Sequence, residues 1–189
     1  MDIEKALEIV RHKLPKKRFE HSVRVAETAV KLAEMFNGDK YNCELAGILH
    51  DYCKYDELSE MYQIVIREKL DPALLGFNKE LLHGPVAAIK MRDDYGIKND
   101  EILLAISNHT SGRDHMTLNE KIIYVADYIE PERDQKNVDD IRKIVYEDKH
   151  LDLAVYEITK ATIKHLLKSD KTIYPRTIEC LNYYNMVKE

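Results

Sequence analysis

A histidine-aspartate pair, His50-Asp51, ends an apolar stretch of this 189-residue sequence. Cys43, Ala46 and Gly47 precede His50 at helical spacing, so we expect its imidazole to continue the buried face of a helix. The small residues on that face predict that a neighbouring helix comes close. The pair alone is a weak signal, because such doublets also arise by chance.

Three more residues repeat this arrangement on other predicted helices. Apolar residues at helical spacing follow His21 and precede His109, and Asp127 lies in an apolar window of the chain. A polar or charged group on a buried face is costly unless something compensates it. A metal ion bound by His21, His50, Asp51 and Asp127 would compensate all four, and imidazole with carboxylate ligands suits iron or manganese.

His83 differs from these residues because Gly84-Pro85 follows it. Proline is preferred at the first position of a helix, which predicts a helix start at this point. The backbone N–H groups at the start of a helix favour a phosphate. We therefore expect His83 to lie beside a phosphate-binding helix N-terminus.

Helical periodicity runs along almost the whole chain, and no stretch shows the alternation of a strand. Expected helix breaks lie at Pro15, Gly38, Pro72 to Gly76, Gly84-Pro85, Gly96, Gly112, Pro131 and Tyr174-Pro175. The sequence predicts an all-α fold, a single bundle of about nine or ten helices over residues 1–189. We expect the metal and phosphate site within about residues 16–138. Residues 139–189 are expected to form packing helices and to offer an oligomer surface.

Composition narrows the classes of function. A formal net charge of −5 argues against nucleic-acid and membrane-surface binding, which need clustered Lys and Arg. It allows a phosphorylated substrate, because divalent ions reverse the local sign of a cleft. Charged residues interrupt the first 19 residues, so we expect no signal peptide and a cytoplasmic protein. Cys43, Cys53 and Cys180 are expected to be reduced, mostly buried thiols.

Each candidate ligand also has a simpler interpretation as a hydrogen-bonded core or surface group. The other four histidines serve as a comparison set, since they lie in polar surroundings and are expected to face solvent: His12, His115, His150 and His165. Only the conjunction of inward-facing imidazoles and carboxylates, in this order along the chain, favours a metal site.

Five blocks of sequence carry a resemblance to a known family: KRFEHSVRVAETA, AGILHDYCKY, LLHGPVAA, ISNHTSGR and ADYIEPERD. The order His21, His50-Asp51, Asp127 resembles the HD superfamily of metal-dependent phosphohydrolases. Together the blocks are similar to its YqeK-type symmetrical bis(5'-nucleosyl)-tetraphosphatases, over about residues 16–138.

This resemblance implies an HD-domain fold and a divalent metal. Iron is the expected metal, as one or two ions, with manganese or cobalt as substitutes. His83 and His109 stand where binuclear members of the superfamily bind a second ion. If only one ion binds, we expect these two histidines to contact phosphate instead.

Asp51 and Lys54 are the expected catalytic residues. Asp51 is the natural bridge between two ions, and Lys54 lies one helical turn later, where its ammonium can hold a phosphate or the attacking water. A metal-activated water would perform the attack, so no protein nucleophile is required. Expected substrate contacts are Lys54, His83, His109, Thr110, Arg113, Arg133 and Arg18. A solvated or ion-paired surface group is the alternative for each basic residue.

By resemblance, the expected reaction is hydrolysis of dinucleoside polyphosphates, with diadenosine tetraphosphate cleaved to two ADP. The residues alone indicate only hydrolysis of a phosphate ester or anhydride. One alternative is an HD phosphohydrolase that acts on mononucleotides or cyclic dinucleotides. A second is a non-catalytic nucleotide-binding helical module. The expected partner is a small nucleotide, and a homodimer is left open.

Overall fold

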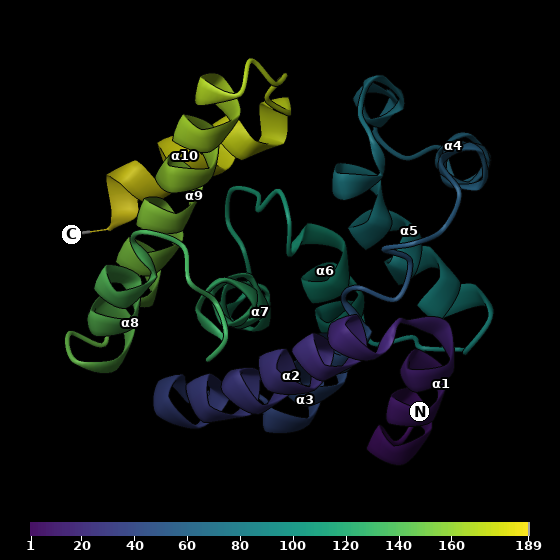
Figure 1. Ribbon diagram of the computed structural model, residues 1–189, viewed down its shortest axis with the longest axis horizontal. Helices are drawn as coiled ribbons and strands as arrows, with labels where there is room; N and C mark the ends of the chain where they lie inside the picture. The colour runs from purple at the N-terminus through teal and green to yellow at the C-terminus, as the bar shows by residue number, and fades with distance from the viewer. Residues whose placement is uncertain (189) are drawn as a thin grey trace.

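The computed structural model describes residues 1–188, which form helices joined by short loops (Figure 1). Its elements are α1 (Ile3–Lys13), α2 (Lys16–Phe36), α3 (Lys40–Leu49), α4 (Leu58–Arg67), a short 3-10 helix η1 (Pro72–Gly76), α5 (Lys79–Asp93), α6 (Asp100–Asn108), α7 (Leu118–Ile129), α8 (Val138–Tyr146), α9 (Leu151–Lys168) and α10 (Pro175–Val187). Ten α-helices and no strand occur within residues 1–188, which confirms the predicted all-α fold.

Local capping explains several helix boundaries. The Asp2 side chain accepts a hydrogen bond from the backbone N–H of Lys5 at the start of α1. Thr117 and Glu120 form a reciprocal capping box at the start of α7. At the end of α2, Asn37 adopts the left-handed conformation with φ 59°, which terminates the helix just before Gly38.

The predicted helix start at Gly84-Pro85 is wrong. α5 begins earlier, because Asn78 caps it by accepting a hydrogen bond from a backbone N–H of the first turn. Pro85 lies inside α5, where the missing N–H costs one helical hydrogen bond without ending the helix. His83 therefore lies within a helix, and the phosphate-binding role that we inferred from a helix start does not apply to it.

Two glycines allow neighbouring helices to approach closely. A Cβ atom at Gly47 of α3 would lie 2.7 Å from the Cα of Ala26 in α2. One at Gly84 of α5 would lie 2.9 Å from the backbone oxygen of Ser107, near the end of α6. Side chains on these two helix pairs can consequently reach a common point.

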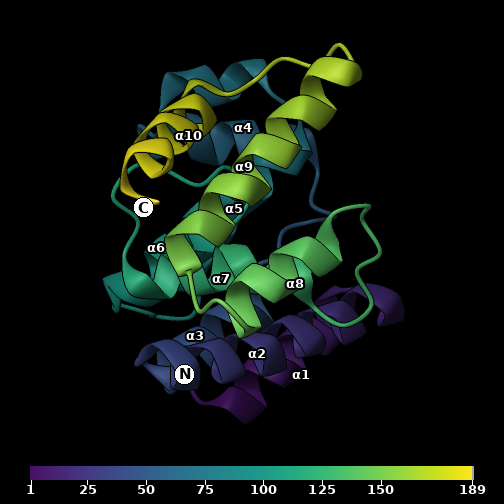
Figure 2. The ribbon, with the colours of Figure 1, turned by 90° about the vertical axis from the view of Figure 1, so that its left-hand side faces the viewer.

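Four helices form the centre of the molecule. α2 packs along α3, and α6 and α7 pack against each other and against this pair (Figure 1). α4 and α5 lie on one side of the four, and α8, α9 and α10 lie on the other, with α9 running across α7 (Figures 1 and 2). The core of this arrangement is apolar, with fully buried residues such as Leu32, Leu49, Ile106 and Ile123. In the part of the chain that the structure describes, no helix is both long and apolar enough to span a lipid bilayer.

Candidate metal centre

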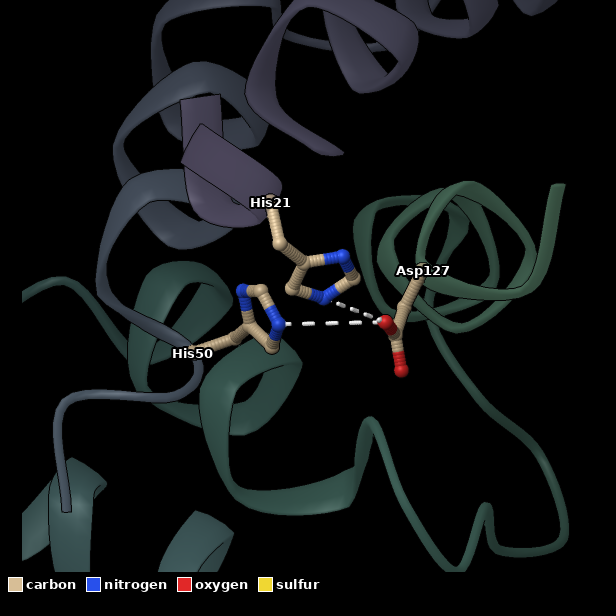
Figure 3. A group of neighbouring side chains, drawn as sticks. All are labelled: His21, His50 and Asp127. Atoms are coloured by element: carbon tan, nitrogen blue, oxygen red, sulfur yellow. Dashed lines mark ion pairs between the residues drawn. The ribbon is translucent and has the colours of Figure 1, made fainter. Parts of the chain in front are cut away.

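His21, His50, Asp51 and Asp127 come together between α2, α7 and the end of α3. His21 and His50 both aim their Nε2 atoms at the carboxylate of Asp127 (Figure 3). His21 Nε2 lies 3.0 Å from Asp127 Oδ1 and 3.8 Å from Asp51 Oδ2. His50 Nε2 lies 3.4 Å from Asp51 Oδ2. The four residues thus share one point, at which His21, His50 and Asp51 are buried and the Asp127 side chain is 24% exposed, although more than 70 residues separate Asp51 from Asp127 along the chain.

His83 and His109 approach the same carboxylate from its other side. His83 Nε2 lies 2.9 Å from Asp51 Oδ1, and His109 Nε2 lies 3.9 Å from that oxygen. The two Nε2 atoms are 2.9 Å apart. One oxygen of Asp51 therefore faces the His21 and His50 pair, and the other faces the His83 and His109 pair.

Backbone carbonyl groups fix the proton position on three of these imidazoles. The Nδ1–O distances are 2.7 Å from His50 to Gly47, 3.1 Å from His83 to Lys79 and 2.7 Å from His109 to Ile106. A carbonyl oxygen can only accept, so each Nδ1 must be the donor. In a neutral imidazole Nε2 then carries a lone pair that faces the centre. Because His83 Nε2 and His109 Nε2 share a hydrogen bond at 2.9 Å, one of these two carries a proton that a metal ion would replace.

The Glu130 carboxylate fixes the proton position on the His21 imidazole, and this residue was not identified from the sequence. Its Oε1 atom accepts from His21 Nδ1 at 3.1 Å, and its Oε2 atom accepts from Arg24 Nε at 2.7 Å. Burial raises the pKa of Glu130, but Arg24, the backbone N–H of Glu132 and His21 outweigh it and lower that pKa. The place of Glu130 one helical turn after Asp127 was the signal available in the sequence.

The ligand atoms at this centre are almost all hydrogen-bond acceptors. His21 Nε2 and His50 Nε2 are buried and have no hydrogen-bond partner. Burial raises the pKa of Asp51 and Asp127, but protonated imidazoles nearby, and Arg133 beside Asp127, outweigh it and hold both pKa values well below the ordinary range; a bound cation would take the place of these protons. Two ionised carboxylates and converging imidazole lone pairs fit a bound cation, which would satisfy them together.

Three basic side chains border this centre. Arg18 Nη1 donates to Asp51 Oδ2 at 2.8 Å, and Arg133 Nη2 donates to Asp127 Oδ1 at 2.6 Å. Lys54 Nζ lies 4.0 Å from Asp51 Oδ1 and pairs with Glu80 at 2.8 Å. All three remain partly exposed, so their cationic groups are reachable from solvent.

The two candidates that follow His109 have separate positions. The hydroxyl of Thr110 lies 3.0 Å from His109 Nε2, at the edge of the centre. Arg113 instead donates two hydrogen bonds to the buried Glu120, at 2.8 and 2.6 Å. The structure does not bring Arg113 to the centre, because the buried carboxylate that caps α7 holds its guanidinium.

The comparison histidines stay away from the centre. His12, His115 and His165 are exposed, whereas His150 is partly buried and accepts from the backbone N–H of Leu153 as the cap of α9. The three cysteines are buried free thiols, as predicted.

A cavity adjoins the centre on the Thr110 side. The space in front of Asp51 and Asp127 measures about 190 Å³, and it shares Thr110 and Thr162 with a second cavity of about 440 Å³. The larger cavity is lined by the aromatic residues Phe77 and Tyr174 and by polar groups, among them Asn78, Lys171, Thr172 and Thr177. Residues 162–177, in the segment expected to pack against the bundle, thus also supply a wall of this cavity.

Comparison with known proteins extends this description. The HD domain family matches residues 18–132. The chain is 53% identical to a Staphylococcus aureus protein named bis(5'-nucleosyl)-tetraphosphatase, symmetrical, over 100% of this chain and 97% of the relative. A Bacillus subtilis protein of the same name is 43% identical over 97% of each chain. A Clostridium acetobutylicum crystal structure, described as a predicted HD superfamily hydrolase involved in NAD metabolism, is 36% identical with a TM-score of 0.92 and covers 100% of this chain and 99% of that one.

Proposed function

This chain belongs to the HD domain family, and on that premise we propose that it hydrolyses dinucleoside polyphosphates, cleaving diadenosine tetraphosphate symmetrically into two ADP. Full-length relatives named symmetrical bis(5'-nucleosyl)-tetraphosphatase support this reaction. The all-helical fold and the buried cluster of imidazoles and carboxylates agree with a metal-dependent phosphohydrolase.

One observation carries the proposal: the Nε2 atoms of His21 and His50 are buried beside the carboxylates of Asp51 and Asp127 and have no hydrogen-bond partner in the protein. We propose that His21, His50, Asp51 and Asp127 would hold a divalent ion, and that His83 and His109 would hold a second ion together with Asp51, whose two oxygens face the two histidine pairs. Iron suits this mixture of imidazole and carboxylate, and manganese or cobalt would substitute. If only one ion binds, His83 and His109 contact a phosphate instead.

The chemistry that a divalent ion supplies when bound is a lowered pKa for a water molecule and neutralisation of charge on the phosphoryl oxygens. Lys54 would hold a phosphate or the attacking water, a role supported by the distance of 4.0 Å between its ammonium and Asp51 Oδ1. Arg18 and Arg133 donate to the two carboxylates from the opposite rim, and their free N–H groups can hold phosphate oxygens. Thr110 would add a hydroxyl contact beside His109.

The cavity of about 440 Å³ is our candidate site for one nucleoside. Its size lies in the usual range for small-molecule sites. Phe77 and Tyr174 pack against each other edge to face in its wall, with ring centroids 5.4 Å apart, and present aromatic surface to a base. Polar groups such as Asn78 and Thr172 can then bind the sugar or the base edge.

We also propose that the enzyme works in the cytoplasm. Its three cysteines are buried and unpaired, which suits a reducing compartment.

Product chromatography tests the reaction. Protein reconstituted anaerobically with ferrous ion should convert diadenosine tetraphosphate to ADP alone. ATP plus AMP would overturn the symmetrical assignment. Faster turnover of mononucleotides or cyclic dinucleotides would support another HD phosphohydrolase, and tight metal and nucleotide binding without any product would support a binding module.

A further inference from the structure

The carboxylate of Asp51 has two differently equipped sides. Its Oδ1 atom faces His83 and Lys54, on the side where the cavity beside Thr110 opens. Its Oδ2 atom faces Arg18. Symmetrical hydrolysis cuts a dinucleoside tetraphosphate between its two middle phosphates. One nucleoside diphosphate then extends on each side of the place of cleavage beside Asp51. The cavity provides for one nucleoside, and the second must lie on the Arg18 side.

An aromatic side chain stands on that second side. Arg18 donates to Asp51 Oδ2, and although burial lowers the pKa of its guanidinium, Asp51 and the neighbouring Tyr55 outweigh burial and raise it. The Tyr55 residue is 51% exposed, although it follows Lys54 directly in the turn that carries Asp51. Its ring can therefore receive a planar group from solvent next to a cation that can hold phosphate.

The turn that presents Tyr55 is firmly anchored. The next residue, Asp56, is buried and pairs with Lys13 of α1 at 2.5 Å and with Lys90 of α5 at 2.8 Å. Cys53 in the same turn is fully buried. An exposed ring on such a rigid support loses little conformational freedom when it binds a ligand.

We propose that Tyr55 is a stacking platform for the second nucleoside of the substrate, with Arg18 holding the phosphates that precede it. This inference rests on the proposed function, because a substrate with one nucleoside would not need the platform. It assigns the preference for dinucleotides over mononucleotides to a residue outside the metal centre. The base is recognised by its π face, so different bases would be accepted.

Steady-state kinetics on Tyr55 variants tests the platform. Tyr55→Ala and Tyr55→Leu should each raise KM for diadenosine tetraphosphate roughly tenfold, the range for loss of one base–aromatic contact, with kcat changed less than about twofold. Tyr55→Phe should keep the wild-type KM, because it keeps the ring. The inhibition constant of ADP, a probe with a single nucleoside, should stay within about twofold of wild type in all three variants.

Controls separate this inference from the function on which it rests. Tyr41→Ala removes another exposed tyrosine, at the start of α3, and should leave KM unchanged. A wild-type KM in both Tyr55→Ala and Tyr55→Leu would overturn the platform, as would an equal loss in Tyr55→Phe or an equal rise in the ADP inhibition constant. Wild-type protein that yields no ADP would instead overturn the proposed function, and the platform with it.

Discussion

Asp51 and Asp56 lie in the same turn after α3, and both side chains are buried, yet their surroundings differ. We call the first group the metal centre (His21, His50, Asp51, His83, His109 and Asp127) and the second the Asp56 cluster (Lys13, Cys53, Asp56 and Lys90). In the Asp56 cluster two ammonium groups donate to the carboxylate. In the metal centre, imidazole nitrogens with lone pairs surround the carboxylates.

This difference shows which buried carboxylate needs a partner from outside the chain. The pKa is lowered for both aspartates, although burial alone would raise it, so the direction of the shift does not separate them. The donors do. Asp56 is balanced by two lysines of the same chain, whereas Asp51 accepts from Arg18, lies 4.0 Å from Lys54 Nζ and sits among four imidazoles. A buried carboxylate is thus a metal-ligand candidate when its neighbours are acceptors.

The largest expected effect is that of Asp51→Ala. The substitution removes the carboxylate that both histidine pairs share, so we expect turnover to fall more than about a thousandfold, together with loss of bound metal. Elemental analysis and product chromatography measure the two losses, and circular dichroism should show the helices intact. His50→Ala should cause the same losses of turnover and of bound metal. Full activity in either variant would reject the metal centre.

Asp56→Asn should lower the stability of the fold and leave the bound metal content unchanged. Loss of the charge leaves Lys13 and Lys90 without their partner. We expect a fall of about 2–3 kcal/mol in the free energy of unfolding at pH 7, below the range for fully buried pairs because both lysines are partly exposed. Urea unfolding measures this fall, and metal content per chain should stay at the wild-type value.

The pH dependence of that fall checks its origin. Lysine hydrogen bonds outweigh burial and lower the pKa of Asp56 in the folded state. Its stabilising contribution is therefore complete above the ordinary aspartate pKa and is lost as the pH falls through the lowered value. The difference between wild type and Asp56→Asn should shrink on acidification. A difference independent of pH would show that the charge is not its cause.

Glu130→Gln should weaken the metal centre without dismantling it. The amide keeps the shape of the side chain but loses the charge that orients His21, so metal affinity should fall about 10- to 100-fold. Competition with a chelator measures this affinity. Glu132→Gln is the matched control, because Glu132 also pairs with Arg24 but is exposed. Equal losses in the two variants would contradict a specific role for Glu130.

The smallest effect on activity is expected from Arg113→Met. Its guanidinium forms an ion pair with the buried Glu120. The Glu120 carboxylate also accepts hydrogen bonds from Asn108 at 2.7 Å and from the backbone N–H of Thr117 at 2.7 Å. We expect kcat/KM to change less than about twofold, with a loss of about 1–2 kcal/mol in unfolding free energy. A tenfold rise in KM would restore Arg113 as a phosphate contact.

Local sequence signals were sufficient for the fold class and for most helix boundaries. Pro15, Gly38, Gly96 and Pro175 lie at or between helix ends, as predicted, because proline and glycine act on the backbone at their own position. Pro85 was the exception, since the cap at Asn78 starts α5 a turn and a half earlier and the helix tolerates one missing N–H.

The sequence by itself also determined which residue types lie on buried faces, and so predicted that His21, His50 and Asp127 point inward. Only the tertiary structure decided which atoms meet: the Nε2 lone pairs at Asp51, the Glu130 contact to His21 and the capture of Arg113 by Glu120. The physical reason is that helical periodicity orients a side chain relative to its own helix. Whether a donor or an acceptor faces it depends on the packing of helices that are distant in the chain.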